Sequence, residues 1–310
     1  MSQDVVVQLR NVTKRIGSKT IVDKLTFDVP RGEVFGFLGP NGAGKTTTIR
    51  MIVGLISMSE GEVLVNGINV SQHFEKAMMH IGAIVENPEL YKFLTGYQNL
   101  IHFARMIPGI PKERIDEVIK LVKLENRIHD KVKTYSLGMR QRLGVAQAIL
   151  HRPDVLILDE PTNGLDPEGI RELRDYLRQL AKSEGTAIIV SSHLLSEMEL
   201  MCDRVAIIQN GKLVNVQHMR EMVQQQTDEA SLVVFEVDDP QQAIRLLSES
   251  VSVTEAAVTP EGVTLYLQRD QVPDAISRLV GGNVRIYSVK PASMTLEDKF
   301  LELTRGGQIV

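Results

Sequence analysis

The residues with the clearest chemistry lie near the front of the chain, in the run Gly39-Pro40-Asn41-Gly42-Ala43-Gly44-Lys45-Thr46. This run matches the pattern G-x-x-x-x-G-K-[ST], in which glycines let backbone N–H groups curl around phosphates. Lys45 would place its charge on the β- and γ-phosphates, and Thr46 would offer its hydroxyl to Mg²⁺. We expect this loop, together with Thr47, to bind a nucleoside triphosphate.

The segments on either side of the loop agree with this interpretation. Residues 33–38 form a short apolar run that is typical of a buried parallel strand, and residues 47–52 continue as a helix. The order of strand, loop and helix places a helix N-terminus at the bound anion. The alternative, a chance match in a glycine-rich turn, does not require these flanks.

A second source of metal ligands follows the apolar run 155–158. Asp159 would hold Mg²⁺, directly or through water. Glu160 is placed where a carboxylate could take a proton from a water that attacks the γ-phosphorus, so we assign it as general base. Two acidic residues after such a run are also compatible with a helix-capping turn.

Composition bounds the class of protein. With 310 residues, the chain is long enough for a full α/β domain and a smaller second one. A net charge of −4 gives no reason to expect nucleic acid as the main partner. The single cysteine, Cys202, and a polar, acidic N-terminus indicate a reducing cytoplasm, and no run approaches the ~18 apolar residues of a membrane span.

The pattern of residues 1–226 predicts an α/β nucleotide-binding domain. Residues 5–10 and 24–29 have the pattern of an antiparallel lead-in sheet. From about 34 to 207, strand and helix patterns alternate, which favours a parallel core sheet. Residues about 96–151 are mostly helical and form an insertion.

The character of the chain changes after a Gln-rich stretch that ends at residue 226. Residues 227–292 follow the order βαββαβ, which predicts a small α+β domain of the ferredoxin-like type. Residues 293–310 form a tail in which Leu296, Phe300 and Leu303 have helical spacing.

The order of these elements resembles an ATP-binding cassette ATPase, the motor subunit of ABC transporters, over about residues 5–225. Residues 135–142 resemble the signature segment of that family, with Ser136, Leu137, Gly138 and Met139 at its centre. Asp166 is similar to the residue of the loop that links two composite sites. His193 matches the switch histidine, although such a residue taken alone is more often a strand-end histidine without a ligand.

The resemblance implies a mechanism that needs two copies of the cassette. ATP would lie between the phosphate loop of one copy and the signature of the other, where Ser136 and Gly138 would reach the γ-phosphate in trans. Because the chain carries one loop and one signature, we expect a homodimer. ATP and Mg²⁺ are the implied ligands.

Three positions depart from the usual family pattern. Ile16 stands where an aromatic ring usually stacks on adenine. Glu86 stands where glutamine is usual; we interpret it as metal-linked and conformational, against the alternative of a solvated loop carboxylate. Leu137 and Met139 replace glycine and glutamine in the signature. The glutamate variant resembles the bacitracin- and lantibiotic-resistance branch of ABC exporters.

The remaining expectations concern partners. In the family, the segment after Glu86 receives a separate transmembrane permease, and the apolar residues here, which could equally be local core, are Tyr91, Phe93, Leu94 and Tyr97. Residues 295–304 are similar to the C-terminal segment of drug and antibiotic exporters. We therefore expect an ATPase peripheral on the inner face of the membrane that drives export of an antibiotic, peptide or other amphiphile.

Two other classes of function compete with the exporter. A soluble cassette ATPase of ribosomes or DNA would typically carry two cassettes with a basic linker, or a long coiled-coil insertion. Neither is present in the sequence. A pseudo-ATPase is disfavoured because Lys45, Asp159, Glu160 and His193 are all intact.

Overall fold

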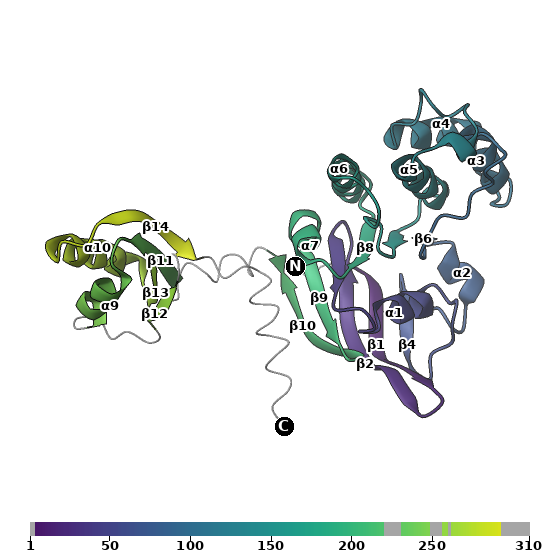
Figure 1. The fold of residues 1–310 in the computed structure, drawn as a ribbon. Helices are drawn as coiled ribbons and strands as arrows, with labels where there is room; N and C mark the ends of the chain where they lie inside the picture. The colour runs from purple at the N-terminus through teal and green to yellow at the C-terminus, as the bar shows by residue number, and fades with distance from the viewer. Residues whose placement is uncertain (1–3, 220–230, 249–255, 260–261, 293–310) are drawn as a thin grey trace. The chain divides into compact units, whose positions relative to one another are not determined.

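The phosphate loop extends from a six-stranded sheet. The computed structural model describes residues 4–219, 231–248, 256–259 and 262–292. In spatial order the strands of this sheet are β10 (Lys212–His218), β9 (Arg204–Gln209), β3 (Val34–Leu38), β8 (Ala187–Ser192), β7 (Val155–Leu158) and β6 (Ile81–Ile84). The strands from β9 to β6 are parallel, and β10 pairs antiparallel with β9 (Figure 1).

The inner strands are buried on both faces, which is why they are short, continuous apolar runs. Every residue of β3, β7 and β8 is buried. These three strands are neighbours in the order β3-β8-β7 and run parallel, so their carboxyl ends lie side by side. The residues that follow β3, β8, β7 and β6 therefore meet at one edge of the sheet.

An antiparallel sheet accompanies the parallel one. Its strands, in spatial order, are β2 (Lys19–Pro30), β1 (Val5–Ile16), β4 (Glu60–Val65) and β5 (Ile68–Asn69). The hairpin of β1 and β2 is longer than the sequence pattern predicted, because the pairing continues through several register shifts. Phe27 of β2 packs against Phe35 and Phe37 of β3, so one core joins the two sheets.

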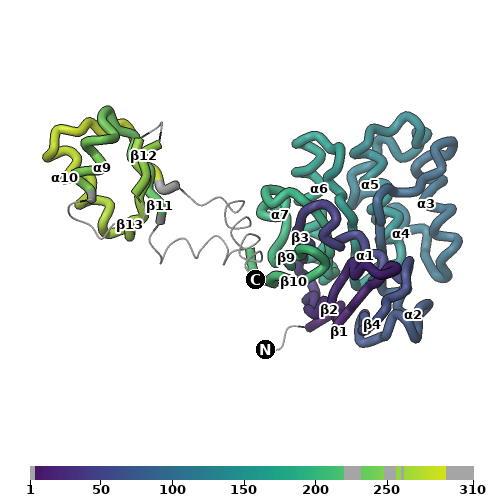
Figure 2. The backbone as a smooth tube through the Cα atoms, turned by 60° about the horizontal axis from the view of Figure 1, so that its bottom comes forward, coloured from purple at the N-terminus to yellow at the C-terminus, as the bar shows by residue number. Residues whose placement is uncertain are grey.

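The helices of this part of the chain are α1 (Lys45–Ile52), α2 (Phe74–Met78), α3 (Gly96–Ala104), α4 (Lys112–Leu121), α5 (Leu137–Ala148), α6 (Pro167–Glu184) and α7 (Leu195–Met201), with a 3₁₀ turn η1 (Val132–Thr134). Figures 1 and 2 show α3, α4 and α5 grouped together, away from β1 and β2. The parallel core sheet, the antiparallel lead-in and the helical insertion expected from the sequence are all present.

Contacts divide the chain into two compact units, Met1–Met219 and Arg220–Val310. The second unit contains β11 (Ser231–Val237), α9 (Pro240–Ser248), β12 (Ala257–Thr259), β13 (Gly262–Leu267), η2 (Arg269–Gln271), α10 (Val272–Gly281) and β14 (Ile286–Ala292). Its antiparallel sheet has the order β12-β13-β11-β14, and Phe235 and Leu265 lie in a core that includes residues of both helices. The element order is βαββαβ.

Parts of the sequence expectations fall outside the described residues: the end of the Gln-rich stretch up to residue 226, the first residues, 251–255, of the strand that the pattern predicts over 251–258, and the tail 293–310. Within the described part of the chain, no helix is both long enough and apolar enough to cross a bilayer.

Candidate active site

The phosphate loop is shaped by two glycines with different roles. A Cβ on Gly39 would lie 2.1 Å from the carbonyl oxygen of Ile208 on β9, so only glycine lets the loop leave β3 this close to the neighbouring strand. Gly44 has φ of 106°, in the region that favours glycine, and is the N-cap of α1. The loop therefore ends where the N–H groups of α1 begin.

Lys45, the first residue of α1, is almost fully buried at 5% exposure. Its Nζ donates to the carbonyl oxygens of Gly39 at 2.8 Å and Pro40 at 3.4 Å. The same ammonium lies 3.5 Å from Oε1 of Glu160. The charge of Lys45 is thus held against the loop, with one carboxylate as its counter-ion.

Asp159 follows β7 and faces the start of α1. Its Oδ1 accepts from the hydroxyl of Thr46 at 3.2 Å and from the hydroxyl of Ser191 at 2.6 Å. A carboxylate beside a threonine hydroxyl, next to a phosphate loop, is a donor set that Mg²⁺ accepts, since this ion takes one or two carboxylates and completes its shell with phosphates and water. The residues therefore fit the expected Mg²⁺.

Glu160 adopts a backbone conformation that is rare for its type, with φ of 48°. Its N–H donates to Oγ of Ser191 at 2.8 Å, and its Oε2 lies 3.0 Å from Nδ1 of His193. The left-handed turn directs the two neighbouring carboxylates to different partners. The helix-capping alternative is wrong, because Asp166 is the residue that caps α6.

The loop after β7 has a second tie to the end of β8 that sequence reasoning missed. Oε2 of Glu197, on α7, accepts from the hydroxyls of Thr162 at 2.6 Å and Ser192 at 2.8 Å. The two serines directly before His193, Ser191 and Ser192, could have indicated these contacts, but from the sequence only the histidine was assigned a role. The Glu197 carboxylate therefore joins Thr162 to Ser192, whereas Ser191 alone contacts Asp159 and Glu160.

Two of the unusual positions lie at the margin of this site. Glu86 has φ of 69° and forms an ion pair with Arg50 at the end of α1, while its side chain stays 61% exposed. Ile16 is 60% exposed at the tip of the β1–β2 hairpin. Its neighbour Arg15 pairs with Glu60 at 2.5 Å, and this hydrogen bond raises the pKa of the guanidinium.

The signature and the linking loop share one cleft of about 460 Å³. Ser136 is the N-cap of α5 and accepts from the N–H of Met139 at 3.2 Å, and Leu137 is the first helical residue. Asp166 caps α6 by accepting from the N–H of Gly169 at 2.9 Å. Both helix N-termini, whose N–H groups attract anions, line this cleft, and Gly138 is the second residue of α5. The carboxylates of Glu168 and Glu172 line it as well.

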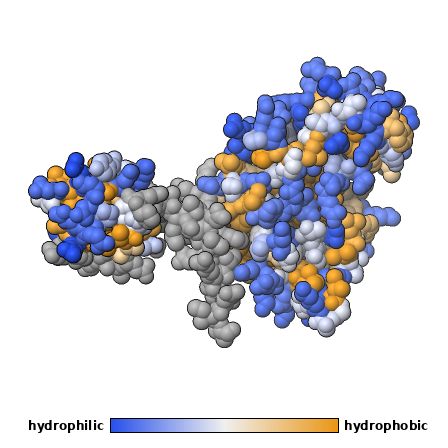
Figure 3. Space-filling view, in the orientation of Figure 1, coloured by the Kyte–Doolittle hydropathy of each residue, from blue (hydrophilic) through white to orange (hydrophobic). Residues whose placement is uncertain are grey.

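The aromatic residues expected at a docking surface are only partly in the core. Tyr91 and Phe93 are 41% and 69% exposed, and Leu94 and Tyr97 are half-buried. The ring of Tyr91 contacts those of His102 and Phe103 on α3. Apolar surface is visible where α3 lies in Figure 3.

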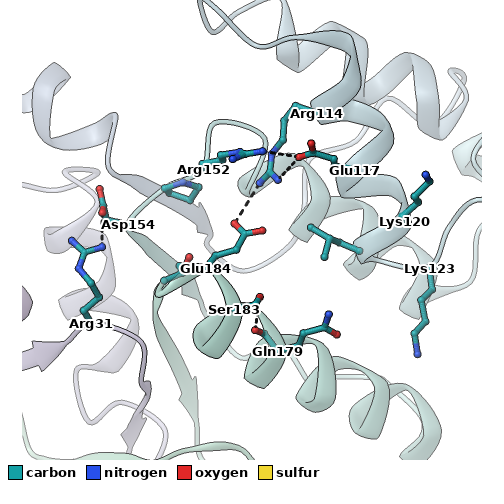
Figure 4. A pocket seen from close by; sticks show the side chains of 13 residues that line it. Arg31, Arg114, Glu117, Lys120, Lys123, Arg152, Asp154, Gln179, Ser183 and Glu184 are labelled. Carbon is teal, nitrogen blue, oxygen red and sulfur yellow. Dashed lines mark hydrogen bonds and ion pairs between the residues drawn. The ribbon is translucent and has the colours of Figure 1, made fainter.

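Another cleft, of about 760 Å³, lies at the opposite ends of the strands, between α4 and α6 (Figure 4). Several of its charged residues are paired: Arg114 reaches Glu117 at 3.1 Å and Glu184 at 3.7 Å, while Lys120 and Lys123 add further positive charge to the lining. Arg31 donates to Asp154 at 2.7 Å. Burial alone would raise the pKa of Asp154, but the hydrogen bonds from Arg31 and His80 outweigh it and lower that pKa. The arginines at this edge of the sheet are therefore held in structural ion pairs.

The fold and the site define a nucleotide-binding ATPase, and comparison with known proteins identifies its family. The family model described as ABC transporter matches residues 22–163. The chain is 57% identical, over 96% of each chain, to the uncharacterized ABC transporter ATP-binding protein YhcH of Bacillus subtilis (strain 168). It is 38% identical to the bacitracin transport ATP-binding protein BcrA of Bacillus licheniformis, covering 98% of this chain and 99% of BcrA.

A solved dimeric structure of the ATP-binding cassette MJ0796, in a post-hydrolysis state with ADP and Pi, has the same fold. It is 24% identical, with a TM-score of 0.61, and covers 69% of this chain and 99% of the other. The chain belongs to the ABC transporter family as an ATP-binding subunit. It is an ATPase, and ATP is its nucleotide.

Proposed function

We propose that this protein is the motor subunit of an ABC exporter that removes an antibiotic, peptide or other amphiphile from the cell. It works as a homodimer on the inner face of the membrane, docked on a separately encoded permease. The observation that carries the proposal is the linked set of Lys45, Asp159, Glu160 and His193 at one edge of the sheet. Near full-length similarity to BcrA supports the choice of cargo class.

In the proposed mechanism, Lys45 and the loop N–H groups bind the β- and γ-phosphates. Thr46 and Asp159 hold Mg²⁺, which supplies positive charge to the phosphates when bound. Glu160 accepts the proton of the attacking water, and His193 orients its carboxylate from 3.0 Å. Because Lys45 already lies 3.5 Å from Glu160, the ammonium exchanges a carboxylate for phosphate when ATP binds.

The proposal of a homodimer rests on the cleft at the signature. That cleft is lined by the N-termini of two helices, α5 and α6. Ser136 is the N-cap of α5, and Gly138 lies in its first turn. Three acidic residues line the cleft: Asp166 caps α6, Glu172 lies 3.5 Å from Arg142, and Glu168 is exposed in the first turn of α6. A γ-phosphate bound to a second copy would meet the N-terminal N–H groups of α5 there.

The proposed permease surface is the aromatic group of Tyr91, Phe93 and Tyr97, next to Glu86. Phe93 is 69% exposed and its ring contacts that of Tyr91, and an exposed aromatic side chain of this kind can fill a partner's pocket. The ion pair of Glu86 with Arg50 connects this surface to α1, which begins at the phosphate loop. We also propose that Glu86 is linked to the metal site, together with Thr46 and Asp159.

The test is a tagged pull-down from native membranes in mild detergent with ATP, followed by mass spectrometry. The expected catch is a multi-span permease in near-equal amount, lost in Phe93→Asp and retained in Val280→Asp, a control that charges an equally exposed apolar residue of α10. Both variants must still bind ATP. A catch of ribosomal or DNA-bound proteins in place of a permease would overturn the exporter.

A further inference from the structure

The register of the central strands places a buried hydroxyl between the two acidic residues of the site. Leu158 of β7 pairs with Val190 of the parallel strand β8, so the next residues along the two strands, Asp159 and Ser191, are neighbours. Ser191 is fully buried, at 0% exposure. Its side chain therefore has no alternative partner in solvent.

The hydroxyl of Ser191 uses both of its hydrogen-bonding capacities. It donates to Oδ1 of Asp159 at 2.6 Å and accepts from the backbone N–H of Glu160 at 2.8 Å. A hydroxyl can donate to one residue and accept from the next through a single oxygen, whereas an alkyl side chain does neither and a thiol does both only weakly. Alanine at this position would therefore lose both contacts.

The two contacts fall on features that the chemistry needs. Oδ1 of Asp159 also accepts from Thr46, so the Ser191 hydroxyl fixes which way the metal-binding carboxylate is turned. Glu160 stands in a left-handed conformation that is costly for a non-glycine residue and persists only when its surroundings impose it. The hydrogen bond to its N–H imposes that conformation and aims its side chain at Lys45 and His193.

We propose that Ser191 is a positioning residue that couples the metal ligand Asp159 to the general base Glu160. The inference rests on the proposed function, since it takes the roles of Asp159 and Glu160 from there. Its distinguishing consequence is that one hydroxyl controls two separate properties, the affinity for the divalent ion and the rate of hydrolysis. A residue that only supported the fold would lower stability without this paired effect.

The test compares Ser191→Ala with Ser191→Thr, which restores the hydroxyl. Ser192→Ala is the matched control, because Ser192 is as buried, lies on the same strand, and donates to Glu197 instead. Binding of Mn²⁺ in the presence of a non-hydrolysable ATP analogue is followed by electron paramagnetic resonance. Steady-state ATPase assays give kcat and KM separately, and thermal denaturation checks folding.

For Ser191→Ala we expect kcat to fall by about 10- to 100-fold, the range for losing a hydrogen bond to a charged group, with KM for ATP changed less than about threefold. The Mn²⁺ dissociation constant should rise several-fold. Ser191→Thr should recover most of both losses, and Ser192→Ala should leave Mn²⁺ binding as in the wild type. Where Ser191→Ala does not fold, Ser191→Cys replaces it, since its thiol is of similar size and a weak donor.

Wild-type kcat and Mn²⁺ affinity in folded Ser191→Ala or Ser191→Cys would overturn the proposal, and so would a Ser191→Thr protein that is as impaired as they are. Glu160→Gln is measured alongside. If that variant hydrolyses ATP at the wild-type rate, the assignment of Glu160 has failed. If it is inactive while the Ser191 variants behave as wild type, only the present inference has failed.

Discussion

Replacing Glu160 with glutamine separates the two jobs that the structure gives to this carboxylate. The change keeps the size of the side chain but removes its charge and its ability to take a proton. Proton transfer by a positioned base contributes typically ~10²–10⁴ in rate, so we expect kcat to fall by about that factor, or about 3–5 kcal/mol in the activation barrier.

The same substitution acts on nucleotide binding in the opposite direction. In the free protein, Oε1 of Glu160 lies 3.5 Å from Nζ of Lys45, and both side chains are shielded from solvent. Their direct attraction is about 5 kcal/mol at an effective dielectric near 20, most of it offset by desolvation. A net release of about 1 kcal/mol would leave Lys45 more available to phosphate and tighten ATP binding roughly fivefold.

The assay pairs isothermal titration calorimetry with a phosphate-release assay at saturating ATP. Glu75→Gln is the control, because Glu75 is an exposed glutamate in the first turn of α2. The reasoning would be refuted by a Glu160→Gln protein that retains wild-type turnover. Weaker ATP binding in that variant would refute the account of Lys45, whatever happened to the rate.

Three further predictions use other parts of the first unit. Ile16→Tyr should bind ATP more tightly through stacking on adenine, and unchanged affinity by calorimetry would contradict the placement of that loop. Arg114→Met should lower the free energy of unfolding by about 3–5 kcal/mol, because Arg114 is buried and donates to two carbonyls at the end of α5; a urea titration that gives less than about 1 kcal/mol would refute this. Burial lowers the pKa of His151 in the folded state, so below pH ~6.5 the unfolded chain binds the proton first and stability is lost as pH falls. Between pH 7 and pH 5.5, the free energy of unfolding should fall less in His151→Gln than in the wild type, by up to about 1.4 kcal/mol per pH unit. Equal pH dependence of stability in the two proteins would contradict this assignment of His151.

The parts of the site that could be predicted from the sequence are those encoded within one segment of chain. The phosphate loop is such a segment, since strand, glycines, Lys45 and helix follow one another directly. Asp159 and Glu160 are another, because a buried strand ends where they begin. Local order also accounts for the fold class, as alternating apolar runs and amphipathic helices leave few topologies open.

The contacts that connect those segments could not be predicted in this way. Chain order runs from β3 through β6 and β7 to β8, whereas the sheet inserts β8 between β3 and β7. That insertion is what brings Ser191 to Asp159, and no local periodicity encodes it. The pairing of Glu86 with Arg50 likewise joins residues far apart in the sequence.

The left-handed backbone conformation of Glu160 could not be predicted from the sequence either. Glutamate has no intrinsic preference for φ of 48°, so the conformation arises from tertiary contacts, chiefly the hydrogen bond to Ser191. Similarly, the exposed fraction of Phe93 depends on how α3 packs, which composition does not reveal. In both cases the deciding information is spatial.

The two ends of the parallel strands carry different sets of residues, and this separation affects how stability and activity can vary between variants of the protein. The carboxyl ends carry Lys45, Asp159 and Glu160, whereas the amino ends carry the ion pairs of Arg31 with Asp154 and of Arg114 with Glu184. A five-residue strand such as β3 is roughly 16 Å long. Substitutions more than about 7–10 Å apart usually have additive effects. Substitutions at the amino ends of the strands can therefore raise or lower thermal stability, in evolution or by design. The rate of ATP hydrolysis, which depends on residues at the carboxyl ends, should stay unchanged.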